Sequence, residues 1–352
     1  MSHTETILRA VNREPTEQVP FALLSSGAWA INRNDVTLQR ALELPAETMA
    51  DWLYEGYTLV DSGISWVGSG YNNIVVKAVG GKIKFRRKGT PDVVEPLFAT
   101  ADDTDAIDPA SVLRDPDIQL LYGATRLLVE KERGERLVGA SMWGPFTLTG
   151  LLFGADALMR SVYKNPEAVE KLMNFSVELY LNYMQGYIDA GARVIFMAEP
   201  SASGDMISRK HFEAVALPYI KRIYERLSAK GLVLGLHICG NTANRLDLIA
   251  QSGAQVMSLD YKVDLDEARG AFDGKIAFSG NMNPVTIVQN GTEDEIRASV
   301  LECIERAGGG GGYIVMPGCD IPPSTPPENL QTIAKVVAEY NTEHKQERII
   351  HG

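Results

Sequence analysis

Short apolar runs alternate with longer amphipathic segments along the chain from residue 136 onward. Six apolar runs are typical of buried strands: Leu137–Met142, Val194–Ala198, Leu232–Cys239, Val256–Asp260, Ile276–Gly280 and Tyr313–Met316. Apolar residues at helical spacing predict helices between them: Ala155–Ala190 with a break near Pro166, Arg209–Ala229, Arg245–Gln251, a short helix near Leu265, and Glu293–Ala307. This alternation is typical of parallel strands that are joined by helices.

The first third of the chain is less regular. Val19–Leu24 and Ile64–Val67 read as two further strands, which would bring the number of strands to eight. Ile74–Arg87 alternates around two glycines and predicts a β-hairpin outside this series. At the other end, Thr325 as N-cap and Glu328 three residues later predict a last helix over Pro326–Tyr340.

No repeat, low-complexity tract or linker divides the chain. We therefore expect residues 1–352 to form one α/β domain, a single (β/α)8 TIM barrel with an N-terminal extension and a β-hairpin excursion. The length of 352 residues and the hydrophobic content of 45% suit this class.

The net charge of −11 makes binding to nucleic acid or to an anionic membrane surface a poor hypothesis. Neither a signal peptide nor a run of about 18 apolar residues is present, so we expect a cytoplasmic protein. Three cysteines are too few for a disulfide framework, and they favour a reducing compartment.

Candidate metal ligands lie at the ends of two predicted strands. His237 and Cys239 are two residues apart and therefore point to the same side, and Cys319 follows the strand that begins at Tyr313. Parallel strands of a barrel end on one rim, where barrel enzymes place their active sites. One imidazole and two thiolates suit Zn²⁺ with a fourth, open coordination position.

Other polar residues at strand ends have two interpretations each. Glu199 could complete the zinc shell or act in catalysis, and Asn281 could bind substrate, but both could instead hold a loop. For Asp205 we expect a loop role and for His211 a surface or capping role. Cys303 falls at helical spacing with apolar neighbours and is predicted to be buried in the core.

Five segments carry a resemblance to a known family: Ile7–Pro20, Glu199–Ser208, His237–Asn241, Ser279–Asn281 and Pro317–Asn329. Together they resemble the corrinoid-dependent methyltransferase branch of the uroporphyrinogen decarboxylase family, which includes methylcobamide:coenzyme M methyltransferases and O-demethylase methyltransferases. The resemblance implies a (β/α)8 barrel and makes His237, Cys239 and Cys319 zinc ligands. It also implies a corrinoid (cobalamin) carried on a separate corrinoid-binding protein as partner.

One segment departs from the decarboxylases of that family, which carry arginines and a catalytic aspartate after the first strand. Here residues 21–30 contain no charged side chain, so a substrate with many carboxylates would have no counter-charge. A uroporphyrinogen-type decarboxylase is therefore disfavoured, and a third alternative is a non-catalytic barrel with structural zinc or a binding protein.

Two methyl transfers remain open. An aryl methyl ether or phenol is favoured as the small-molecule methyl donor or acceptor, and a coenzyme M-like thiol is the alternative. The first hypothesis expects an aromatic pocket lined by Trp29, Trp66, Tyr71, Trp143, Phe146 and Phe153. The sequence leaves open the direction of transfer, the fourth zinc ligand and the oligomeric state.

Overall fold

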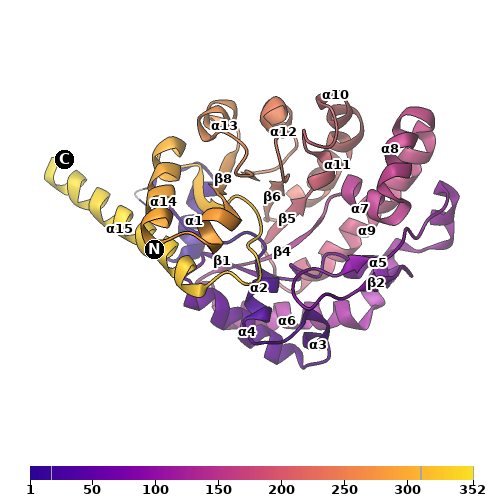
Figure 1. Ribbon diagram of the computed structural model, residues 1–352, viewed down its shortest axis with the longest axis horizontal. Coiled ribbons are helices and arrows are strands. Elements are labelled where there is room, and N and C mark those ends of the chain that lie inside the picture. Colours follow the sequence, from indigo (N-terminus) through magenta and orange to yellow (C-terminus); the bar gives the residue numbers. More distant parts are fainter. Residues whose placement is uncertain (17, 310, 352) are drawn as a thin grey trace.

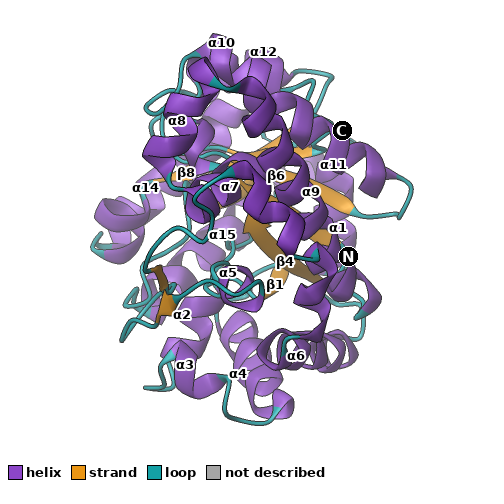
Figure 2. Ribbon diagram, turned by 90° about the vertical axis from the view of Figure 1, so that its right-hand side faces the viewer, coloured by secondary structure: helices purple, strands orange, loops and turns teal. Residues whose placement is uncertain are grey.

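Seven parallel strands form the central sheet of the computed structural model, which describes residues 1–16, 18–309 and 311–351. They are β1 (Ile64–Val67), β4 (Leu137–Trp143), β5 (Val194–Ala198), β6 (Val233–His237), β7 (Val256–Ser258), β8 (Ala277–Met282) and β9 (Tyr313–Pro317). Their order in the sheet is the order along the chain, and every pair is parallel. Figure 2 shows these strands in the middle of the molecule with helices around them.

Helices connect successive strands and cover the outside of the sheet. Before β4 the α-helices are α1 (His3–Val11), α2 (Gly27–Asn32), α3 (Leu38–Ala41), α4 (Ala46–Leu59), α5 (Ile74–Ala78) and α6 (Pro116–Glu132). After β4 they are α7 (Pro145–Phe153), α8 (Ala155–Lys164), α9 (Pro166–Asp189), α10 (Arg209–His211), α11 (Leu217–Ser228), α12 (Leu246–Ile249), α13 (Leu265–Phe272), α14 (Glu293–Ala307) and α15 (Pro327–His351). In Figure 1, α10, α12 and α13 lie above the strands and α3, α4 and α6 below them.

Short 3₁₀ and π turns complete the connections. They are η1 (Ala101–Ala106), η2 (Pro109–Arg114), η3 (Pro200–Ala202), η4 (Phe212–Ala216), η5 (Ala243–Arg245) and η6 (Pro284–Gln289). The α/β architecture and the parallel sheet predicted from the sequence are confirmed.

The segment around Phe21 joins the two edges of the sheet. Phe21 forms a parallel bridge with Val315 of β9, and its carbonyl accepts a 2.9 Å hydrogen bond from the amide of Gly63, directly before β1. The prediction of a full strand at Val19–Leu24 is wrong, because the segment is limited to this bridge. Pro20 has no N–H group, which removes one donor from any longer ladder.

The hairpin predicted at Ile74–Arg87 is partly wrong. Ile74–Ala78 is the helix α5, and the antiparallel hairpin comes later, between β2 (Ile83–Lys84) and β3 (Asp92–Val93). The run Ile74–Val76 is fully buried instead of alternating between two faces, and this burial favours a helical turn.

Local sequence explains where several helices begin and end. Thr292 and Glu295 form a reciprocal capping box at the start of α14, and Gly308 ends this helix with a φ of 86°. The predicted break near Pro166 separates α8 from α9. The capping box predicted for α15 is not found: the helix begins at Pro327, and the Thr325 hydroxyl donates to the carbonyl of Pro322.

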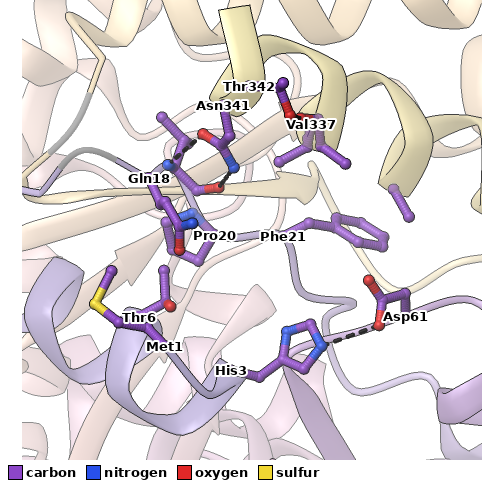
Figure 3. A pocket seen from close by; sticks show the side chains of 13 residues that line it. Met1, His3, Thr6, Gln18, Pro20, Phe21, Asp61, Val337, Asn341 and Thr342 are labelled. Carbon is purple, nitrogen blue, oxygen red and sulfur yellow. Dashed lines mark hydrogen bonds and ion pairs between the residues drawn. The ribbon is translucent and has the colours of Figure 1, made fainter. Parts of the chain in front are cut away.

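Helix α15 ties the end of the described chain to its beginning. The side chain of Asn341 accepts a hydrogen bond from the Val19 amide at 2.8 Å and donates to the Val19 carbonyl at 3.0 Å. A surface hollow lies beside these bonds, between α1, residues 18–21 and α15 (Figure 3). Within the residues that the structure describes, no helix has the length and apolar character needed to cross a membrane.

Candidate metal centre

The side chains of His237, Cys239 and Cys319 meet at one end of the sheet. His237 is the last residue of β6, and Cys239 and Cys319 each lie two residues beyond the end of a strand. His237 Nε2 is 3.0 Å from Cys239 Sγ, which is 3.4 Å from Cys319 Sγ. In a flat sheet β6 and β9 would lie about 14 Å apart, because two strands separate them. Curvature of the sheet therefore creates this cluster.

The imidazole of His237 is fixed by contacts on its other nitrogen. Nδ1 lies 3.1 Å from both the carbonyl oxygen and the hydroxyl oxygen of Ser258 in β7, and the residue is buried. A carbonyl only accepts, so Nδ1 carries the proton that it donates there. This tautomer leaves the lone pair of Nε2 directed at the two sulfur atoms, as a metal ligand requires.

The three donors fit a zinc ion. Their ligating atoms lie within 4.8 Å of one another, and zinc bonds of about 2.0–2.3 Å place tetrahedral ligands roughly 3.5–3.8 Å apart. The distances from Cys239 Sγ to His237 Nε2 and to Cys319 Sγ, 3.0 and 3.4 Å, are slightly shorter, so these ligands would separate by a few tenths of an ångström. The neighbouring Cys239 thiol and burial raise the pKa of Cys319, and a bound cation would oppose both effects.

Glycines beside the cysteines let the loops approach closely. Gly240 has a φ of 91° and donates a 2.8 Å hydrogen bond to Asp260, and a Cβ atom at this position would lie 2.5 Å from an oxygen of Asp205. At Gly318 a Cβ atom would lie 2.7 Å from the amide nitrogen of Tyr261. Side chains at these two glycines would displace the loops that carry Cys239 and Cys319.

The carboxylate of Glu199 is fully buried and is directed at the start of α7. It accepts hydrogen bonds from the amide of Phe146 at 3.1 Å and from the amide of Thr147 at 2.6 Å. Burial raises the pKa of Glu199 to about 7, although these hydrogen bonds act in the opposite direction. Its main chain lies beside the three candidate ligands, since the Glu199 amide donates to the His237 carbonyl.

The side chain of Asn281 also forms hydrogen bonds to the surrounding loops. Its amide group donates to the carbonyl of Asp260 at 3.1 Å and to that of Val263 at 2.7 Å. Asp205 accepts hydrogen bonds from the Asn241 amide and from the Lys262 ammonium group. Both residues hold the loops that follow β5, β6 and β7.

Arg245 has a positioning role that the sequence did not suggest. Its guanidinium group is fully buried and donates to the carbonyls of Ala202 at 2.6 Å and Ile207 at 2.8 Å, and it lies over the ring of Phe212. It therefore anchors the loop between Glu199 and Ser208. A single arginine after a strand carries no sequence signal of burial, because arginine is usually exposed.

Two other residues lie outside the cluster. His211 contacts the hydroxyl group of Ser208 at 2.9 Å near the surface. Cys303 is buried in α14, as the helical spacing predicted.

A small pocket of about 90 Å³ opens above the three donors. Of the six aromatic residues expected around it, Trp143 lines the pocket, together with Phe196, which was not expected. The prediction is wrong for Trp29, Trp66, Tyr71 and Phe146, which are buried in the core, and Phe153 does not line this pocket either. Aromatic side chains fill cores as readily as they line pockets, so residue type could not separate the two.

Comparison with known proteins places this geometry in a family. Residues 2–340 match the family described as uroporphyrinogen decarboxylase (URO-D). The chain belongs to the uroporphyrinogen decarboxylase family. The methylcobamide:CoM methyltransferase MtbA of Methanosarcina mazei is 28% identical over 339 residues, which cover 96% of this chain and 97% of that protein.

Relatives with a different name are also similar to this chain, over a smaller part of its length. A uroporphyrinogen decarboxylase of Syntrophotalea carbinolica is 29% identical over 271 residues, covering 75% of this chain and 76% of that protein. A solved structure described as a methyltransferase from Methanosarcina mazei has a TM-score of 0.86 at 23% identity and covers 97% of this chain and 99% of that one. That structure shares the fold of this chain. Because relatives with this fold carry two different names, only the residues of the site can distinguish a methyltransferase from a decarboxylase.

Proposed function

We propose that this chain is a zinc-dependent methyltransferase that moves a methyl group between the cobalt of a corrinoid and a small thiol. The observation that carries the proposal is the convergence of His237, Cys239 and Cys319 beneath a small pocket. The relatives named as methylcobamide:CoM methyltransferases support both the corrinoid and the thiol. The corrinoid would arrive on a partner protein.

Zinc bound by the three residues would supply a Lewis acid that lowers the pKa of a coordinated thiol. The chain's own contribution is to orient the ligands. Ser258 holds the His237 ring, and the loops after β6 and β9 bring the two cysteine sulfurs to it. The pocket walls, which include Trp143 and Phe196, would limit the access of water to the reacting sulfur.

The proposed transfer balances without an oxidant or reductant. A bond forms between the thiol sulfur and the methyl carbon as the bond between cobalt and that carbon breaks. Both electrons of the broken bond remain with cobalt, and the thiol proton leaves to solvent. The products are a thioether and a demethylated corrinoid.

The aryl methyl ether that the sequence favoured has less support than the thiol. Of the six aromatic residues on which that hypothesis depended, only Trp143 lines the pocket. The methylcobamide relatives are named for coenzyme M instead. Decarboxylation of a porphyrinogen has less support still, because a pocket of about 90 Å³ falls well below the roughly 300–1,000 Å³ of common ligand pockets.

Glu199 and Asn281 are proposed to act as positioning residues. Glu199 holds the start of α7 and Asn281 holds residues 260–263, so both shape the rim without pointing at the three donors. A role for either in direct contact with substrate stays a prediction from the sequence.

The test combines zinc content with methyl transfer. We expect about one zinc ion per chain in the purified protein, and methylation of a thiol by methylcobalamin. His237→Ala and Cys319→Ala should lose both properties. Cys303→Ala is the matched control, because this cysteine is buried in α14 and should leave the zinc content unchanged. Full activity in a zinc-free preparation would contradict the proposal.

A further inference from the structure

The pocket above the metal ligands contains little charge. Its polar lining comes from Ser25, Asn72, Thr90, Ser141 and Asp320, in addition to the ligands. Among the described residues that line it, none is lysine or arginine. A substrate tail that enters this pocket therefore meets hydroxyl groups, an amide, apolar side chains and one carboxyl group.

Asp320 adds a buried carboxyl oxygen to the pocket. It directly follows Cys319 in the chain, and its Oδ1 atom is buried without a hydrogen-bond partner in the described structure. A buried polar atom without a partner costs free energy, so a donor group that a substrate brings to Asp320 would be favoured.

Cations near the rim are already engaged or lie in solvent. Lys262 pairs with Asp205 at 2.9 Å, and Arg86 pairs with Asp92. Arg87 and Lys88 precede the pocket residue Thr90, but both are exposed and do not line the pocket. Exposed charges contribute little to binding at a distance, because water and salt screen them.

We infer that the thiol used by this enzyme carries no negative charge beyond its sulfur atom; the inference rests on the proposed function. An anionic tail would lose its hydration in the pocket without gaining a counter-charge. A tail that is uncharged avoids this loss, and a donor on it can bond to Asp320. The pocket thus selects against sulfonate and carboxylate thiols, and in this the chain would differ from the relatives that are named for coenzyme M, which is a sulfonate.

Three thiols with the same two-carbon spacer test this selection. 2-Mercaptoethanol is neutral at its far end, 2-aminoethanethiol is cationic and 2-mercaptoethanesulfonate is anionic. With methylcobalamin as donor and the zinc-loaded protein, we expect kcat/KM for the sulfonate to be about ten-fold or more below that for 2-mercaptoethanol. The cationic thiol also loses its hydration in the pocket, so it too should fall below the neutral one once the fraction of thiolate is matched.

A designed cation supplies the converse test. Thr90 is half-buried in the pocket wall, so Thr90→Lys would place an ammonium group near the substrate tail. It should raise the kcat/KM ratio of sulfonate to neutral thiol several-fold, and this ratio should stay unchanged in Thr90→Gln, which is similar in length but uncharged.

Two results would contradict these expectations in different ways. A wild-type preference for the sulfonate that is lost in Lys88→Gln or Arg87→Gln would overturn the selection while leaving the methyltransferase intact. A zinc-loaded protein that methylates none of the three thiols would overturn the proposed function itself, and the inference with it.

Discussion

Ser258 holds the imidazole of His237 through two acceptors, and these differ in how they respond to mutation. Ser258→Ala removes the hydroxyl group but keeps the carbonyl oxygen, which lies at the same distance of 3.1 Å from Nδ1. We therefore expect zinc affinity to fall by less than about ten-fold, the lower end for loss of a residue that orients a ligand. Competition with a chelator measures this change.

A loss as complete as that expected for His237→Ala would mean that the hydroxyl group, and not the carbonyl, fixes the ring. In that case the Ser258→Thr variant, which keeps a hydroxyl group at this position, should have a zinc affinity close to that of the wild type.

Gly235 in β6 gives a second prediction for a single residue. A Cβ atom there would lie 2.0 Å from the ring of Phe196, which lines the pocket. Gly235→Ala should therefore lower the free energy of unfolding by about 1–3 kcal/mol, because the ring has to move in a packed interior. Denaturant unfolding measures the loss.

Gly270→Ala is the matched control for this substitution. Gly270 lies in α13, and nothing lies within 4 Å of the position that a Cβ atom would take. Alanine should stabilise that helix by about 0.5–1 kcal/mol. Equal changes in the free energy of unfolding for the two substitutions would mean that the contact with Phe196 does not cause the loss of stability in Gly235→Ala.

The convergence of His237, Cys239 and Cys319 was predictable from the sequence, whereas the pocket lining was not. His237, Cys239 and Cys319 follow apolar strands, and their residue types are scarce and chemically distinctive. Phe196, in contrast, belongs to an apolar strand in which its neighbours Ile195 and Met197 are equally buried. The side of a strand that faces a cavity depends on the curvature of the whole sheet, which local sequence does not encode.

Glu199 and α7 form a unit at the scale of elements. Removal of the carboxylate in Glu199→Ala leaves the buried amides of Phe146 and Thr147 without an acceptor and should cost about 1–3 kcal/mol of stability. Glu199→Gln keeps one oxygen on a side chain of the same length and should cost less. Thermal unfolding and methyl transfer are measured on both variants.

Because Glu199 is proposed to hold the start of α7, we expect the Glu199→Gln variant to keep most of the methyl-transfer rate. A folded Glu199→Gln protein with normal zinc content and no activity would instead assign the carboxylate a direct role in the reaction.

The elements that the sequence predicted well are those with a strong local signal. Val194–Ala198, Ile64–Val67 and Glu293–Ala307 have the same bounds in the structure as in the prediction. The errors at Val19–Leu24 and Ile74–Ala78 have a common origin, because a short apolar run is compatible with either a strand or a buried helical turn. Tertiary contacts decide between them.

The hollow in Figure 3 lies between segments that are far apart in the sequence. The contact between His3 and Asp61 beside it should make the stability of the protein depend on pH. His3 of α1 lies 2.9 Å from Asp61, and this hydrogen bond is the main cause that holds the pKa of Asp61 below its ordinary value of 3.8. The side chain of Asp61 is largely exposed, so solvent screening limits the effect.

Because the pKa is lowered on folding, the stabilisation is present above pH 3.8 and is lost as the pH falls through the lower value of the folded state. Asp61→Asn should therefore cost no more than about 1 kcal/mol at neutral pH and nothing in strong acid. Unfolding curves of both proteins at several pH values should converge toward low pH. Curves that stay parallel would show that the ionised Asp61 carboxylate is not the source of this stabilisation.

The bridge between Phe21 and Val315 has a consequence for the synthesis of the protein. The Phe21 segment can pair with Gly63 as soon as both have left the ribosome. Its pairing with Val315 has to wait until almost 300 residues after Phe21 have been synthesised. At about 5–20 residues per second, this delay is on the order of 15–60 s. During that time both outer strands of the growing sheet expose unpaired backbone groups, so we expect the nascent chain to depend on chaperones until its last strand emerges.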